Sequence, residues 1–231
     1  MVNGMKSIRP VTLREQVFEE IQQAILEQRL KPGDHIREHE LTKLLQVSRT
    51  PVREALVLLE RDGLVEIAPN RGCFVREFDA QDIREIFAMR TALEDMAAEL
   101  IVGQLGPQQL AYLEGMIAKQ QAAGLTGPGS LVAGMVDLEF HKYLVTLAGN
   151  SRLLRTWQAI AIQYTIVFSY LDSVATTDGR RLAIESHQAI LAALRDGDSA
   201  RIGKINRIVN TQMAERCVAG YLARQAEVPV I

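Results

Sequence analysis

Residues 47–56 read VSRTPVREAL, and this stretch decides the fold of the first part of the chain. Ser48 can cap the N-terminus of a helix while Pro51 still lies in its first turn, where the missing N–H of proline costs little. Thr50 as the cap, with Pro51 at the first helical position, is an equally possible register. Either register predicts a helix that ends at Asp62-Gly63.

Two predicted helices precede this stretch and a predicted hairpin follows it. Apolar residues at a helical spacing indicate helices at 11–30 and 38–46. Alternating residues indicate strands at 64–67 and 73–76. Three helices followed by a β-hairpin are typical of a winged helix-turn-helix. The last of the three helices, which is the second of the helix-turn-helix pair, lies in the major groove of DNA. We therefore predict a winged helix-turn-helix DNA-binding domain at residues 10–76.

Basic side chains gather where this domain would meet DNA. Arg49 and Arg53 are four residues apart, so both project from one face of the first turns of the helix. The planar fork of arginine suits a guanine edge or a phosphate, and Thr50 suits a phosphate or a thymine methyl group. The alternative interpretation is an ordinary solvated helix face, because pairs such as Arg53-Glu54 are common on exposed helices.

The turn of the hairpin offers a second contact with DNA. Asn70-Arg71-Gly72 would bring a small backbone and one cation to the minor groove. The predicted DNA-binding residues are therefore Ser48, Arg49, Thr50, Arg53, Arg71 and Gly72.

Residues 10–76 resemble the GntR family of bacterial transcription regulators. The resemblance rests on KPGD at 31–34, EL at 40–41, VSRTPVREAL at 47–56, LERDGLV at 59–65 and NRGCFV at 70–75. It implies a homodimer that binds a short palindromic operator in double-stranded DNA. It also implies that Arg49 and Arg53 contact bases and that Gly72 approaches the minor groove. Some relatives carry a DNA-contacting arginine where this chain has His39.

Composition narrows the class of protein. Of 231 residues, 48% are hydrophobic and 23% are charged, which is typical of a globular protein and excludes a disordered or collagen-like chain. The net charge is −2, so any contact with nucleic acid must be local. Cys73 and Cys217 have no metal-binding spacing, and residues 1–10 contain no apolar signal segment. We therefore expect a cytoplasmic protein with reduced thiols and no membrane contact.

Residues 80–224 show helical patterns throughout. Turn residues such as Gly106-Pro107 and Gly149-Asn150 separate the segments. The predicted helices lie at about 80–103, 107–123, 130–148, 151–175, 179–196 and 198–224. Short connections favour antiparallel neighbours, so we predict an all-α six-helix antiparallel bundle and a mainly α chain.

One predicted helix of the bundle carries two metal-binding residue types. Asp137 and His141 are four residues apart and share one helix face, so both could hold the same metal ion. His187 lies on a later helix. A surface ion pair is the alternative interpretation of Asp137 and His141.

Residues 80–215 resemble the FCD domain, the helical ligand-sensing partner in the FadR branch of the same family. The resemblance rests on RTALE at 90–94, DLEFH at 137–141, AGNSRL at 148–153 and ESHQAI at 185–190. It implies that an aspartate and three histidines hold a divalent ion of the zinc, nickel or manganese class, at which a small organic acid binds as the effector. Asp137, His141 and His187 match three of these positions, and Val209 stands at the fourth.

Val209 leaves three interpretations of the site open. The three ligands could hold an ion that water or the effector completes, or the ion could be weakly bound or different, such as Mg²⁺. Without a metal, His141 and His187 would hydrogen-bond the effector directly. Asn206, three residues before Val209 on the same helical face, could substitute through its amide oxygen, although amides are poor ligands for transition metals.

Arg90 is a further candidate contact for the effector. It lies in the middle of a predicted helix among apolar residues, and a buried arginine needs an anion. That anion is either Glu94, one turn away, or a carboxylate of the effector, as the FCD resemblance implies. The predicted effector-binding residues are Arg90, His141, His187 and Asn206.

The patterns and the two resemblances together predict a ligand-responsive transcription repressor that binds DNA as a dimer. Effector binding to one arrangement of the bundle would change DNA binding by a population shift. A helical metalloenzyme is a second hypothesis, but Glu139 points away from the face of Asp137 and we find no better general base. A domain that binds another protein is a third hypothesis.

Overall fold

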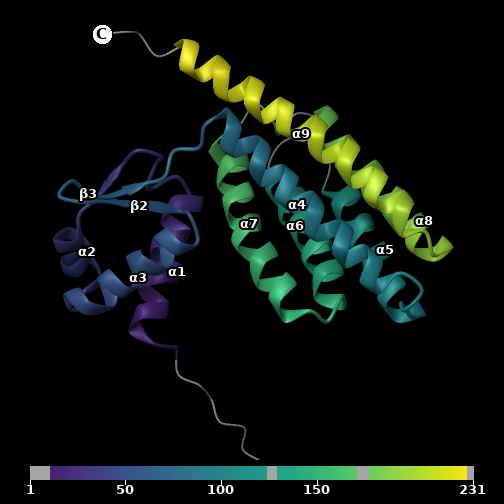
Figure 1. Cartoon of the computed structure of the whole chain (residues 1–231), viewed down its shortest axis with the longest axis horizontal. Coiled ribbons are helices and arrows are strands. Elements are labelled where there is room, and N and C mark those ends of the chain that lie inside the picture. Colours follow the sequence, from purple (N-terminus) through teal and green to yellow (C-terminus); the bar gives the residue numbers. More distant parts are fainter. Residues whose placement is uncertain (1–10, 124–128, 171–176, 228–231) are drawn as a thin grey trace, which may run out of the picture. The chain divides into compact units, whose positions relative to one another are not determined.

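The computed structural model describes residues 11–123, 129–170 and 177–227 of the chain. The chain divides into two compact units, Met1–Glu77 and Phe78–Ile231, here called the N-terminal and C-terminal units (Figure 1). The elements of the N-terminal unit are α1 (Leu13–Leu26), β1 (His35–Ile36), α2 (Glu38–Leu45), α3 (Arg49–Arg61), β2 (Val65–Ala68) and β3 (Gly72–Val75). This order confirms the predicted winged helix-turn-helix fold.

Helix α1 is shorter than the helix predicted at 11–30. Thr12 and Glu15 form a capping box at its start, because the Thr12 hydroxyl accepts from the Glu15 N–H and the Glu15 carboxylate accepts from the Thr12 N–H. The helix ends at Leu26, since Gln28 adopts a left-handed conformation with φ 58°. The prediction that the helix reaches residue 30 is wrong, because a left-handed residue other than glycine leaves no signal in the apolar pattern.

The turn between α2 and α3 sets the start of α3. Gln46 adopts a left-handed conformation with φ 54°, and its backbone N–H donates to the Thr42 carbonyl. Ser48 follows with an extended backbone at the N-cap position, so the register that begins after Ser48 is correct and the register that begins after Thr50 is wrong. The Ser48 side chain makes no capping hydrogen bond to the described residues of α3.

The sheet is antiparallel and has the strand order β1-β3-β2. The predicted hairpin is present, with Ile67 of β2 opposite Cys73 of β3. The sequence did not predict β1, in which His35 lies opposite Phe74 of β3. Two residues are too few for periodicity to indicate a strand.

One face of α3 is buried and the other carries its arginines. Helix α3 packs against α1, α2 and β2. The buried side chains of this core include Val17, Ile21, Ile25, Val52, Ala55, Leu56, Leu59 and Leu64. This packing leaves Arg49 and Arg53 exposed on the opposite side of α3.

The C-terminal unit is a bundle of helices in its described residues, which confirms the predicted mainly α fold. Its elements are α4 (Ala80–Ile101), α5 (Pro107–Ala122), α6 (Gly129–Leu147), α7 (Ser151–Tyr170), α8 (Thr177–Asp196) and α9 (Ser199–Glu227). Helix α4 packs against α6, α7 and α9, and α5 packs against α6 and α8 (Figure 1). Among the described residues, no helix is both long enough and apolar enough to cross a membrane.

The apolar core of the bundle surrounds a set of buried polar side chains. Leu113, Phe140 and Leu191 join α5, α6 and α8 in one cluster of buried residues. Val145 and Trp157 join α6 and α7 in another. The buried polar residues are Arg90, Glu94, Gln120, His141, Ser186, His187, Asn206 and Asn210. Buried polar groups of this kind need partners, and their partners define the candidate site.

Candidate functional site

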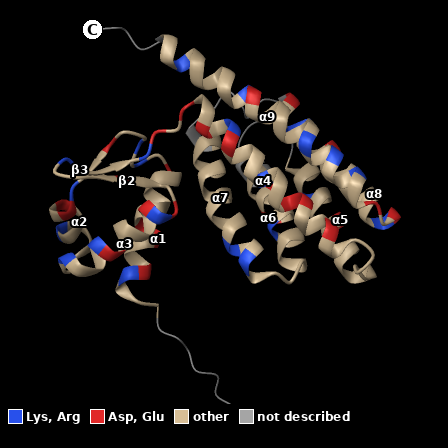
Figure 2. Ribbon diagram, in the orientation of Figure 1, with Lys and Arg blue, Asp and Glu red and all other residues tan. Residues whose placement is uncertain are grey.

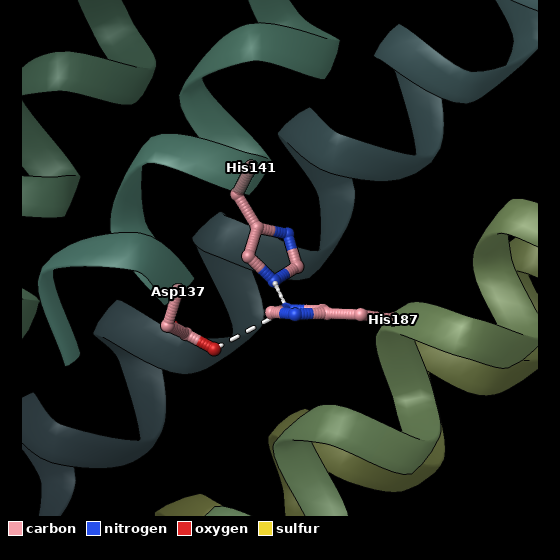
Figure 3. A group of neighbouring side chains, drawn as sticks. All are labelled: Asp137, His141 and His187. Atoms are coloured by element: carbon pink, nitrogen blue, oxygen red, sulfur yellow. Dashed lines mark hydrogen bonds and ion pairs between the residues drawn. The ribbon is translucent and has the colours of Figure 1, made fainter. Parts of the chain in front are cut away.

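Three residues that the sequence singled out meet inside the bundle, and we call them the Asp-His-His cluster: Asp137, His141 and His187 (Figure 3). The helical spacing places Asp137 and His141 one turn apart on α6, and α8 contributes His187. Nε2 of His187 lies 3.1 Å from Nε2 of His141 and 3.3 Å from Oδ1 of Asp137. One ligand atom of each residue lies within 4.8 Å of the other two. The structure therefore brings together the three predicted metal ligands.

Outer partners orient both imidazole rings. Nδ1 of His187 lies 2.8 Å from Oε1 of Gln120, and an amide oxygen can only accept, so this nitrogen carries the proton. Nδ1 of His141 lies 3.0 Å from Oε2 of Glu94, an ion-pair contact that is off the line of a good hydrogen bond. A carboxylate at that distance favours the proton on Nδ1 of His141. Both Nε2 atoms are then left with lone pairs that face the centre of the cluster.

The packing around His187 favours its neutral form. The ring stacks on Phe140 with 4.0 Å between ring centroids. Burial lowers the pKa of His187, although Asp137 opposes this shift through its hydrogen bond and its charge. A neutral imidazole is the form that ligates a metal ion.

The neighbouring charges keep Asp137 ionised. Burial opposes its ionisation, but its close contact with His187 and the charge of Arg90 outweigh burial and lower the pKa of Asp137 well below its usual range. Nη2 of Arg90 lies 3.7 Å from Oδ2 of Asp137. An ionised carboxylate and a neutral His187 imidazole therefore lie side by side.

These three donors fit a divalent ion of the transition series. Two ligands that lie about 2.1 Å from one ion at a right angle are about 3.0 Å apart. The separations of 3.1 and 3.3 Å within the Asp-His-His cluster are close to that value. Imidazole nitrogens suit zinc, nickel, iron or copper better than Mg²⁺, which prefers oxygen ligands. The two contacts of His187 thus match such an ion by distance, and all three residues match it by donor type.

Arg90 lies beside the cluster in a fully buried ion pair. Its Nε donates to Oε1 of Glu94 at 2.7 Å, and the indole N–H of Trp157 donates to the same oxygen at 3.1 Å. The guanidinium lies 4.1 Å from the centre of the Tyr164 ring. Burial opposes ionisation of Glu94, but Arg90 and His141 outweigh it and lower the pKa of Glu94 to about 2. Glu94, one of the two anions considered for Arg90, is thus its ion-pair partner in the structure.

The structure directs Asn206 towards a different neighbour. Its amide nitrogen donates to Oδ1 of Asp95 on α4 at 3.1 Å, and the amide of Asn210 donates to the Thr91 hydroxyl at 2.9 Å. Val209 is half-buried between them on α9. Asn206 is buried, as an effector contact would be, but its amide nitrogen is directed to Asp95. Its expected role in effector binding therefore stays a prediction.

Glu139 lies outside the cluster, as expected from its position on the helix. Its carboxylate is exposed and accepts from Lys142 at 3.2 Å. Sequence reasoning placed Trp157 either in the pocket or in the core but did not link it to Glu94, and it missed Gln120 as a partner of His187. The two residues of each pair are 63 and 67 positions apart in the chain, so no local pattern links them.

The predicted DNA-binding side chains lie on the first turns of α3 and at the tip of the hairpin. Arg49, Thr50 and Arg53 are exposed. Figure 2 marks Lys and Arg on α2 and α3, interspersed with Asp and Glu. A hollow of about 650 Å³ lies between α2, α3 and the sheet. Its lining is His35, Ile36, Arg37, Glu38, His39, Arg49, Arg53, Leu56, Val57, Ile67, Gly72 and Cys73. We call it the arginine hollow.

The backbone conformation at the start of β3 favours glycine at position 72. Its φ of +105° disfavours any residue with a side chain, and a Cβ there would require the exposed His35 ring to shift. His35 stacks on Phe74 with 4.7 Å between ring centroids, and the Arg71 guanidinium lies 5.9 Å from the Phe74 ring. The sequence indicated Arg71 and Gly72, whereas the packing of His35 depends on the unpredicted strand β1.

Comparison with known families gives two matches that together span most of the chain. Residues 13–75 match the description "Bacterial regulatory proteins, gntR family", and residues 85–209 match "FCD domain". The Nta operon transcriptional regulator of Aminobacter aminovorans is 33% identical over 72% of this chain and 76% of its own length. The probable D-xylose utilization operon transcriptional repressor of Paenarthrobacter nicotinovorans is 32% identical over 84% and 83%. The solved structure of Escherichia coli McbR/YncC superposes with a TM-score of 0.76 at 27% identity, covering 92% of this chain and all of that one (100%).

Proposed function

We propose that this chain, which belongs to the gntR family of bacterial regulatory proteins and carries an FCD domain, is a repressor whose affinity for DNA responds to a small organic acid. The family makes it a transcriptional regulator with a DNA-binding domain and not an enzyme. In our proposal residues 10–76 bind the operator, and residues 80–224 sense the effector and form a homodimer. A relative named as a repressor supports the proposed sign of regulation.

The proposed DNA contacts follow the geometry of α3 and the hairpin. Arg49 and Arg53 would contact base edges or phosphates in the major groove, and Ser48 and Thr50 would contact phosphates. The N–H groups in the first turn of α3 lack a side-chain cap from Ser48, which leaves them for a phosphate. Arg71 and Gly72 would approach the minor groove. Binding to the chromosome would place the protein in the bacterial cytoplasm.

The observation that carries the proposed effector site is the Asp-His-His cluster. Two Nε2 lone pairs 3.1 Å apart repel each other unless a proton or a cation lies between them. We propose that Asp137, His141 and His187 hold one divalent ion. When bound, that ion supplies a positive centre for a carboxylate of the effector. Arg90, which lies next to Asp137, would add a second positive charge for the same anion.

An exposed apolar stripe on α4 supports the proposed dimer. Met89, Met96 and Leu100 lie at helical spacing and are 45%, 47% and 38% exposed. A second copy of the chain would bury this stripe and join two DNA-binding domains, which a palindromic operator requires. Effector binding would then favour one arrangement of the dimer over another.

Metal analysis of the purified chain tests the effector site. We expect close to one divalent ion per chain when the protein is purified without chelators. His141→Ala should lose the ion, because it removes one ligand and the ring that faces His187. His39→Ala is the matched control, since His39 is an exposed histidine of the other unit, and it should retain the ion. A native chain without stoichiometric metal, or a His141→Ala variant that keeps it, would contradict the proposal.

A further inference from the structure

An exposed ion pair connects the two helices of the helix-turn-helix. Nε of Arg53, on α3, donates to Oε2 of Glu38, the first residue of α2, at 2.8 Å. The side chains are 64% and 38% exposed, so the pair adds little to stability. Its position is nevertheless specific, because both residues line the arginine hollow.

Glu38 stands out by its charge within that hollow. Among the described residues that line the arginine hollow, Arg37, Arg49 and Arg53 are cations and Glu38 alone carries a carboxylate. A carboxylate on a surface that meets phosphates weakens binding to every DNA sequence equally. Glu38 therefore lowers the affinity for DNA. Its contact with Arg53 indicates a compensating role, which is to orient the Arg53 guanidinium.

The contact occupies one edge of the guanidinium and leaves another edge open. With Nε–H directed to Glu38, the terminal Nη1 and Nη2 groups of Arg53 remain as a pair of parallel donors. That pair matches O6 and N7 of guanine. Glu38 also reduces the number of side-chain conformations in which Arg53 could contact a phosphate instead.

We infer that Glu38 is a positioning residue that fixes Arg53 for reading one base pair, an inference that rests on the DNA contact proposed for Arg53. Glu38 thereby lowers the affinity for DNA of any sequence and raises the preference for one base pair. Glu38→Gln should bind random duplex DNA several-fold more tightly and should steepen the salt dependence of that binding. Its preference at the base pair read by Arg53 should fall about ten-fold.

Selection from a randomised duplex library, carried out with the full chain, tests this inference. Four proteins are compared: native, Glu38→Gln, Glu40→Gln and Arg53→Lys. Glu40→Gln is the matched control, because Glu40 lies in the same first turn of α2 but contacts Arg37, at 3.0 Å. Arg53→Lys keeps the charge and loses the fork, so it identifies the base pair that Arg53 reads. Circular dichroism establishes that each variant is folded.

We expect Glu38→Gln and Arg53→Lys to lose preference at the same base pair, and Glu40→Gln to keep it. If Arg53→Lys loses that preference while Glu38→Gln keeps it, the role of Glu38 is refuted and the contact of Arg53 stands. If Glu38→Gln loses preference at a different base pair, Glu38 reads a base itself and the positioning role is refuted. If Arg53→Lys keeps the full native preference, the proposed contact of Arg53 fails, and the inference fails with it.

Discussion

Two arginine–glutamate pairs of similar geometry lie in opposite environments. Nε of Arg90 lies 2.7 Å from Oε1 of Glu94, and these side chains are 3% and 4% exposed. Nε of Arg53 lies 2.8 Å from Oε2 of Glu38, and these are 64% and 38% exposed. Loss of one partner leaves a charge stranded in the bundle in the first case, whereas water replaces the partner in the second. The two pairs therefore differ in free energy although their distances are nearly the same. We assign the buried pair to the integrity of the sensing site and the exposed pair to DNA recognition.

The largest expected difference between the pairs appears on removal of the arginine. Arg90→Ala should lower the free energy of unfolding by about 3–5 kcal/mol, because Glu94 remains buried beside Trp157 without its cation. Urea unfolding of the full chain, followed by the fluorescence of Trp157, measures this loss. Arg53→Ala is the control in the exposed pair. Equal losses for the two variants would remove the distinction between the pairs.

Acid should weaken the buried pair selectively. The pKa of Glu94 is about 2 in the fold, below its ordinary value of 4.5, so its stabilising contribution is present above about pH 4.5 and is lost as the pH falls towards 2. A shift of this size corresponds to a contribution on the order of 3 kcal/mol. Asp137, whose pKa is also lowered, adds a loss of the same sign.

Urea midpoints between pH 6 and pH 2.5 measure the acid effect. Glu94→Gln, which cannot ionise, should show a weaker dependence on pH than the native chain, and Glu38→Gln should follow the native curve. A native chain whose midpoint changes no more than that of Glu94→Gln would show that the buried carboxylate does not contribute as described.

The buried surroundings should also matter for metal affinity. Gln120→Leu removes the acceptor for Nδ1–H of His187 and leaves the ring free to turn or to change tautomer. Outer partners of this kind change metal affinity by about 10- to 100-fold, so we expect a loss in that range. Competition with a chromophoric zinc chelator measures it. Gln121→Leu, at the exposed neighbouring position, should retain the native affinity; an equal loss there would point to α5 as a whole rather than to the hydrogen bond.

The smallest expected effect belongs to the exposed pair. Arg53→Ala and Glu38→Gln should each change the free energy of unfolding by less than about 1 kcal/mol, since both side chains remain hydrated. Thermal unfolding of the full chain is sufficient to measure this. A change comparable to that of Arg90→Ala would mean that the Arg53–Glu38 contact supports the fold and is not reserved for DNA.

The contacts that local spacing dictates were predictable from the sequence. Asp137 and His141 share a helix face at a spacing of four, and the structure keeps them together. Residues 47–56 predicted both possible starts of α3, but only the left-handed turn at Gln46 distinguished them. Strand β1 could not be predicted from the sequence, because its two residues form a strand only by pairing with β3 and have no pattern of their own.

The contacts that give the candidate sites their character were not predictable. Gln120 meets His187, and Trp157 meets Glu94, only after helices distant in the sequence have packed. Glu38 and Arg53 lie 15 positions apart on different helices, and their contact depends on the angle between those helices. Spacing shows which residues share a face, whereas packing decides which faces meet.

X-ray absorption at the zinc edge of the zinc-loaded chain tests the proposed metal site without relying on activity, because it counts imidazole ligands. The chain has four histidines, and two of them lie in the Asp-His-His cluster. We expect two imidazole nitrogens at about 2.0–2.1 Å together with oxygen ligands, and loss of this signal in His187→Ala. A zinc shell without imidazole, or one that His187→Ala leaves unchanged, would contradict a metal site at Asp137, His141 and His187.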